Sequence, residues 1–378
     1  MMDRGLMTNV SLSVPIRADT VGSLLRPDVL HAARRRFELG EIDATALHEI
    51  EDGAIADVIA YQEGLGLPVV TDGEFRRENW WIDFVRKLKG VEIVAGGGTA
   101  FATNEAPRYV PKSVRVSGRV GAAGPILVDD FRFVQQHGKA IAKIALPSPT
   151  RLHFHGGRKS VSTEVYPDIE AFFSDVAAVY RREIAALEAA GCRYIQIDDP
   201  LLSYFLDPNL RAEVVADGDD PDIRLRRYIR LINDCISERS PATTIGIHIC
   251  RGNARSTWLA EGTYEGLADT CFALLNVDRF LLEYDDERSG SFAPLRFMPR
   301  GKQVVLGLVT TKHAQLENKD ALKRRLDEAA RLIDPSLLAL SPQCGFASVV
   351  EGNLITEADQ RAKLALVVQT AREYWGAV

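Results

Sequence analysis

Residues 244–251 read TIGIHICR, a β-branched run that ends in His248 and Cys250. Residues 194–200 read YIQIDDP and show the same pattern, with Asp198 at the end of an apolar run. Runs of this kind alternate along the chain with long helical patterns, which is typical of βα units around a parallel sheet. Because polar residues fall at the ends of several such runs, the pattern predicts a barrel with its functional side chains on one rim.

The rest of the chain extends this pattern to eight candidate strands. They are residues 16–21, 68–71, 141–146, 194–197, 244–249, 279–283, 303–309 and 337–340. Helical periodicity fills most of the gaps, as in residues 169–190, 224–238 and 319–333. We therefore predict an α/β fold, a single (β/α)8 TIM barrel in which residues 1–378 form one domain. The Gly- and Val-rich residues 90–136 interrupt the rhythm and predict a β-hairpin insertion.

Composition excludes several classes of function. The net charge of −6 offers no basic surface for nucleic acid, and no apolar run is long enough for a membrane-spanning helix. Five cysteines are an odd number and too few for a disulfide scaffold. These features predict a cytoplasmic protein that binds neither nucleic acid nor membrane, in which a cysteine near a histidine is a candidate metal ligand.

His248 and Cys250 are such a pair. Side chains two apart on a strand point to the same side, so both can bind one ion. Zn²⁺ prefers imidazole, thiolate and carboxylate ligands, and Glu283 and Cys344 at other strand ends would complete its shell. The alternative is that His248 and Cys250 are ordinary core residues. The other cysteines lie in apolar patterns and are expected to be inert core thiols: Cys192, Cys235 and Cys271.

Six stretches resemble the cobalamin-independent methionine synthase family, and in particular its short members that keep only the catalytic barrel. They are RADTVGSLLRP, TDGEFRRENWW, YIQIDDPLL, IGIHICRGN, LGLVTTK and LSPQCGFAS, in collinear order from about Arg17 to the C-terminus. The resemblance implies a (β/α)8 barrel with one zinc ion. It also implies the same four ligands, His248, Cys250, Glu283 and Cys344.

By the same resemblance, homocysteine would be bound by the backbone of Val21, Gly22 and Ser23 and by the carboxylates of Glu74 and Asp198. The chemistry agrees, since carboxylates suit an amino acid's ammonium group and the amides of a turn suit its carboxylate. Coordination to zinc deprotonates a thiol, which makes it a nucleophile toward a methyl group. Homocysteine and a methyl donor are thus the expected partners, and methionine the product.

The donor half of the site departs from the family pattern. The position of the family's proton-donating histidine holds Lys312, with His313 one residue further on. A pterin-binding carboxylate is replaced by Tyr204, whereas Arg119 matches a basic folate-contacting position. We expect 5-methyltetrahydrofolate, in its polyglutamate form, as the donor, with Lys312 or His313 as the catalytic acid.

Three alternatives stay open at this stage. The chain could alkylate another thiol, as epoxyalkane:coenzyme M transferases do, but a sulfonate-bearing acceptor would require basic residues in place of Glu74 and Asp198. It could use a donor other than folate. It could also be a zinc-binding protein without catalysis, with an exposed and exchangeable site. Trp80 and Trp81 belong either to the core or to the roof of the pocket, and a homodimer is left open.

Overall fold

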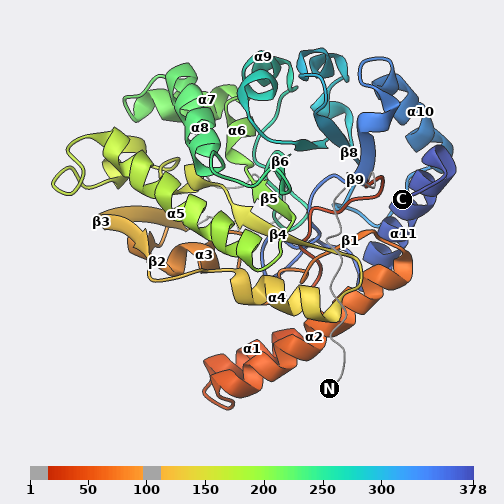
Figure 1. The fold of residues 1–378 in the computed structure, drawn as a ribbon, viewed down its shortest axis with the longest axis horizontal. Coiled ribbons are helices and arrows are strands. Elements are labelled where there is room, and N and C mark those ends of the chain that lie inside the picture. Colours follow the sequence, from red (N-terminus) through yellow and green to blue (C-terminus); the bar gives the residue numbers. More distant parts are fainter. Residues whose placement is uncertain (1–15, 97–111) are drawn as a thin grey trace.

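Seven parallel strands form the central sheet of the computed structural model, which describes residues 16–96 and 112–378 (Figure 1). Each strand pairs with the next in the order β1-β4-β5-β6-β7-β8-β9. Their bounds are β1 Val69–Val70, β4 Ile141–Pro147, β5 Tyr194–Asp198, β6 Thr244–Ile249, β7 Arg279–Glu283, β8 Gln303–Val309 and β9 Leu338–Pro342. The sheet is curled and surrounded by helices, which confirms the predicted α/β barrel-type fold.

Helices follow most strands and cover the outside of the sheet (Figure 1). Their bounds are α1 Asp28–Glu38, α2 Ala44–Leu65, α3 Ile82–Arg86, α4 Val128–His137, α5 Ile169–Ala189, α6 Leu201–Tyr204, α7 Pro208–Ala216, α8 Pro221–Cys235, α9 Glu265–Leu274, α10 Lys319–Ala330 and α11 Glu357–Trp375. Short 3-10 helices lie at Pro149–Leu152, Gly157–Ser160, Glu287–Ser289, Ala293–Phe297 and Pro335–Leu337. The three helices named from periodicity are present with shifted ends, and side chains of Asp168, Asp220 and Asn318 cap them. No helix of the described residues is long and apolar enough to cross a membrane.

The first predicted strand, residues 16–21, is not a strand in the structure. Only Ala18 forms a parallel bridge, to Leu340 of β9. The backbone N–H of Asp19 donates to the Leu340 oxygen at 2.9 Å, but the Asp19 side chain then accepts from the N–H of Thr20. This local hydrogen bond and the Gly22 turn, at φ 129°, end the pairing early. The segment still lies beside β9, where an eighth strand would be.

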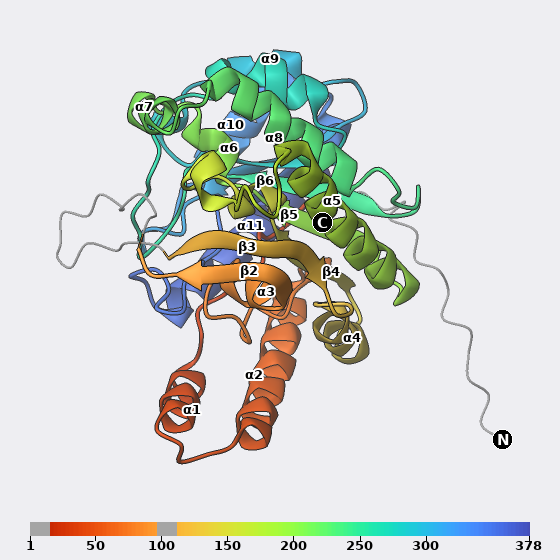
Figure 2. The same cartoon turned by 90° about the vertical axis from the view of Figure 1, so that its left-hand side faces the viewer.

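The predicted insertion contains an antiparallel hairpin of β2, Leu88–Val94, and β3, Ser113–Ala122. Figure 2 shows it beside α3 and α5, outside the central sheet. The expected range of 90–136 was too long, because its last part is helix α4. That part reads VDDFRFVQQH, which has acidic residues in the first turn and apolar residues at helical spacing. The tip of the hairpin lies outside the described residues.

Gly307 in β8 is required by the close approach of its neighbours. A Cβ there would lie 2.6 Å from the Gln343 Cα and 2.8 Å from the Leu282 oxygen, both backbone atoms. We expect Gly307→Ala to lower the free energy of unfolding by about 1–3 kcal/mol, since the neighbouring strand would have to move. Urea denaturation measures this, with Gly121→Ala as the control because no atom lies within 4 Å of its Cβ. Equal stability of both variants would contradict the packing described here.

Candidate functional site

The carboxyl ends of the strands open into one pocket. Seven of the residues singled out in the sequence line it: Val21, Ser23, Glu74, Asp198, His248, Cys250 and Cys344. They come from the segment before α1, the turn after β1, and the ends of β5, β6 and β9. The structure therefore brings together residues that are far apart in the sequence. Five predicted residues are not part of this lining, namely Gly22, Arg119, Glu283, Lys312 and His313.

His248, Cys250 and Cys344 form a group able to hold a metal ion in the described part of the chain. Their ligand atoms all lie within 4.8 Å of one another, and all three residues are buried. The His248 Nε2 lies 3.4 Å from the Cys344 Sγ, while Nδ1 faces the Leu281 oxygen at 3.3 Å. A hydrogen bond from Cys250, together with the nearby His248, lowers the pKa of Cys344 well below its usual value although burial opposes this. One imidazole and two sulfur atoms are a donor set that suits zinc.

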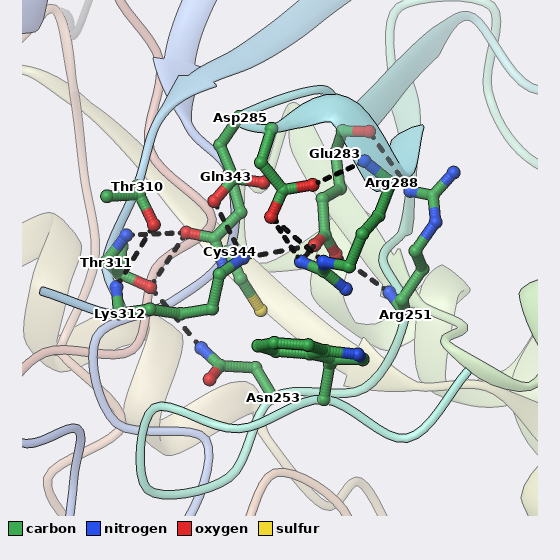
Figure 3. A network of polar contacts seen from close by, with 12 residues as sticks. Arg251, Asn253, Glu283, Asp285, Arg288, Thr310, Thr311, Lys312, Gln343 and Cys344 are labelled. Atoms are coloured by element: carbon green, nitrogen blue, oxygen red, sulfur yellow. Dashed lines mark hydrogen bonds and ion pairs between the residues drawn. The ribbon is translucent and has the colours of Figure 1, made fainter. Parts of the chain in front are cut away.

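Glu283 lies next to this group but is not a member of it. Its carboxylate accepts the backbone N–H of Arg251 at 2.8 Å (Figure 3). The side chains of Lys312 and Arg288 contact the other oxygen at 3.3 and 3.4 Å. Burial raises the pKa of Glu283, but Lys312 and Arg251 outweigh burial and lower it overall. Glu283 is therefore a carboxylate at the edge of the group, and its role as a fourth ligand stays a prediction.

Lys312 forms ion pairs with two buried carboxylates, those of Glu283 and Asp285. Its Nζ lies 2.6 Å from Asp285 and 3.3 Å from Glu283 (Figure 3). Burial lowers the pKa of Lys312, but these two carboxylates raise it overall, so the ammonium form is favoured. Lys312 and the exposed His313 line a second, neighbouring pocket together with Trp258. The structure thus separates both candidate acids from the lining of the main pocket.

Glu74 is held in a strained turn after β1. Its backbone has φ 60°, and the Asp72 carboxylate accepts its N–H at 2.9 Å. The Arg77 guanidinium lies 3.3 Å from its carboxylate, and both side chains are buried. Burial raises the pKa of Glu74 to about 7, with Arg77 opposing the shift and Asp198 adding to it. Glu74 and Asp198 together give this part of the pocket an acidic wall.

Arg119 does not reach the pocket. It lies on β3, where its side chain is 66% exposed and pairs with Asp175 at 3.3 Å. Its guanidinium also covers the ring of Tyr166. The predicted contact with a folate stays a prediction, because Arg119 is not among the residues that line the pocket.

Several lining residues were missed in the sequence. Arg151 stacks on Trp81 with 4.1 Å between its guanidinium carbon and the ring centre, and both line the pocket beside Trp80. This settles the two tryptophans as pocket residues, of which Trp81 is also buried in the core. Burial, followed by the charge of Arg151, lowers the pKa of His155 well below its usual value, so its ring is neutral. No pattern in the sequence indicated that Arg151 and His155 line the pocket beside the two tryptophans.

The remaining cysteines lie in the hydrophobic core. Cys192, Cys235 and Cys271 are fully buried and unpaired. Burial raises the pKa of each thiol, to about 12 for Cys192. A thiol that stays protonated is unreactive, as predicted for these three.

Comparisons with known proteins identify the family of the chain. The family described as cobalamin-independent synthase, catalytic domain, matches residues 17–373. The uncharacterized protein YxjH of Bacillus subtilis (strain 168) is 43% identical, and the match covers 98% of each chain. The methionine synthase of Pyrococcus abyssi (strain GE5 / Orsay) is 25% identical over 89% of this chain and 88% of that protein.

Two solved structures of B12-independent methionine synthases have a similar fold. A Listeria monocytogenes protein assigned to the vitamin-B12-independent methionine synthases is 36% identical, with a TM-score of 0.77 over 96% of this chain and 99% of that one. The B12-independent methionine synthase of Shewanella sp. W3-18-1 shares the fold, with a TM-score of 0.69 at 20% identity over 96% of this chain and 98% of that one. The chain therefore belongs to the cobalamin-independent methionine synthase family, with the match spanning the family's catalytic domain.

Proposed function

We propose that this protein is a zinc-dependent methyltransferase that converts homocysteine to methionine. The observation that carries the proposal is that the His248, Cys250 and Cys344 group and the acidic pair Glu74 and Asp198 line one pocket. A thiol placed at the sulfur-rich group would have its ammonium group within the same pocket as the carboxylates. A thiol without an amino group would use only the first of these two features.

The residues fit a zinc ion. His248, Cys250 and Cys344 would hold it, with Glu283 as a fourth ligand that can yield to the substrate. When bound, zinc supplies the charge that keeps a thiol deprotonated at neutral pH. The buried position of the group argues against an exposed, exchangeable zinc-storage site.

The chain's own residues would orient the amino acid. Glu74 and Asp198 would bind its ammonium group, and the turn at Val21, Gly22 and Ser23 its carboxylate. Gly22 has φ 129°, and the Thr71 hydroxyl donates to its carbonyl oxygen at 2.7 Å, so the turn is fixed. A sulfonate-bearing thiol such as coenzyme M would place a second anion against these two carboxylates, so an amino acid is the better acceptor.

We further propose a cytoplasmic location, with residues 1–378 as one domain. Free cysteines throughout the described residues support a reducing compartment. A homodimer remains a prediction.

The direct test is an activity assay of the zinc-loaded protein with homocysteine and a panel of methyl donors. We expect methionine to form from homocysteine, and no methylated coenzyme M to form when coenzyme M is the acceptor. Formation of methylated coenzyme M without methionine would replace this proposal by the alkyltransferase alternative.

We propose 5-methyltetrahydrofolate as the donor, and this gives a separate prediction. Its leaving nitrogen must be protonated, and general acid catalysis contributes about 10²–10⁴-fold. Lys312 and His313 line the second pocket, so they can serve this donor only if it extends from the main pocket into that one. In that case we expect one of the two variants, Lys312→Met or His313→Asn, to lower turnover by that factor while homocysteine binding is unchanged. Full activity in both variants would instead indicate a donor whose leaving group needs no proton, such as a sulfonium or a methylated corrinoid. Steady-state kinetics and calorimetric titration separate the two effects.

A further inference from the structure

A buried glutamine lies directly behind the acidic wall of the pocket. Gln196 in β5 is two residues before Asp198 and therefore points to the same side of the strand. Its Nε2 donates to the Asp198 carboxylate at 2.6 Å and to the Val21 carbonyl oxygen at 2.8 Å. Both acceptors belong to residues that line the pocket, whereas Gln196 itself is fully buried behind them.

Lys143 fixes which way this amide faces. Its Nζ donates to the Gln196 Oε1 at 2.9 Å. A lysine ammonium has only donors, so the amide oxygen must face it and the NH₂ group must face the two acceptors. The reverse orientation would place two donors against Lys143 and an oxygen against the Asp198 carboxylate. The hydrogen-bonding pattern thus allows one orientation, and that orientation holds Asp198.

Lys143 is itself anchored in the interior of the barrel. The Asp19 carboxylate accepts from Lys143 Nζ at 2.9 Å, from the Tyr194 hydroxyl at 2.7 Å and from Arg279 at 3.1 Å. All of these side chains are buried. Lys143 and Arg279 are two cations and Asp19 is one anion, so the network has an excess positive charge. The Asp198 carboxylate, which is bonded to the amide nitrogen of Gln196, offsets this charge. Buried ion pairs often contribute little net stability, so stability alone does not account for the network.

We propose that Gln196, oriented by Lys143, is a positioning residue that holds the Asp198 carboxylate at the ammonium group of the acceptor amino acid. This rests on the proposed function, since it assigns a role to the homocysteine site. Gln196 touches no substrate atom and acts through Asp198. Its loss should therefore affect acceptors with an ammonium group and spare those without one.

The test compares two thiols on the zinc-loaded protein by calorimetric titration: homocysteine, and 4-mercaptobutanoate, which is the same molecule without the amino group. Gln196→Leu should weaken homocysteine binding roughly tenfold or more, the usual effect of losing a hydrogen bond to a charged group. Binding of 4-mercaptobutanoate should fall much less, because that thiol keeps the carboxylate but has no ammonium group for Asp198 to hold. In kinetics the KM for homocysteine should rise while kcat is kept.

Two further variants make the result decisive. Gln360→Leu removes another buried glutamine, bonded to the Leu25 N–H outside the pocket, and should change neither affinity. Gln196→Glu keeps the shape and pairs with Lys143 but cannot donate to Asp198, so it should reproduce the loss if Gln196→Leu does not fold. Equal losses for both thiols, or none, would overturn the proposal. If the wild-type protein binds neither thiol, the proposed function fails instead.

Discussion

Replacing Cys344 by serine is expected to remove most of the zinc and to abolish methyl transfer. Its sulfur belongs to the group of three ligand atoms that lie within 4.8 Å of one another, so its loss leaves only His248 and Cys250 of that group. Losing a residue that merely supports a ligand costs roughly 10–100-fold in metal affinity, and loss of a ligand should cost more. Cys250→Ser should behave in the same way. Metal analysis by mass spectrometry after dialysis measures the zinc per chain.

Cys271→Ser is the matched control, since Cys271 is also a buried free cysteine but lies in α9 within the core. It should keep about one zinc per chain. All three variants should remain folded, because a sheet of this size with its surrounding helices buries a large core without the ion. Normal zinc content in both Cys250→Ser and Cys344→Ser would rule out the assigned ligands.

Glu74→Gln and Asp198→Asn are each expected to weaken homocysteine binding by roughly 10–100-fold, while the zinc content stays unchanged. Each change replaces a charged acceptor of the ammonium group by a neutral one, and a hydrogen bond to a charged group contributes about 1.5–3 kcal/mol. Since the pKa of Glu74 is raised to about 7 by burial, a lower pH protonates its carboxylate. Homocysteine affinity should therefore fall as the pH drops through about 7, and Glu74→Gln should reduce this dependence.

Glu51→Gln serves as the control for this pair of variants. Glu51 is likewise a buried glutamate with an arginine partner, Arg34 at 3.5 Å, but it lies on α2 away from the pocket lining. Calorimetric titration of the zinc-loaded variants should give a wild-type affinity for Glu51→Gln. Unchanged affinity in both Glu74→Gln and Asp198→Asn would mean that the acidic wall does not bind the acceptor.

The sequence allowed the fold and one side of the site to be predicted because both depend on local patterns. Apolar runs that end in polar residues identify strands and their carboxyl ends, and a parallel sheet brings these ends together. His248 and Cys250 share a strand, so their common facing follows from alternation alone. The prediction of a strand at residues 16–21 was wrong, because the residues after Ala18 form local hydrogen bonds that no periodicity reveals.

The other side of the site depends on contacts between distant segments. Lys312 lies 3.3 Å from Glu283 although 29 residues separate them in the sequence (Figure 3). No pattern in either segment indicates that they meet. For Arg119 the motif matched, but the motif does not reveal how the hairpin packs against α5. This packing leaves the Arg119 side chain exposed.

X-ray absorption at the zinc edge tests the central claim most directly. We predict that the zinc-loaded protein gains one sulfur neighbour when homocysteine is added, because the acceptor thiol is to be held at the His248, Cys250 and Cys344 group. Homoserine, which carries a hydroxyl in place of the thiol, should add no sulfur. An unchanged zinc environment at saturating homocysteine would contradict the account.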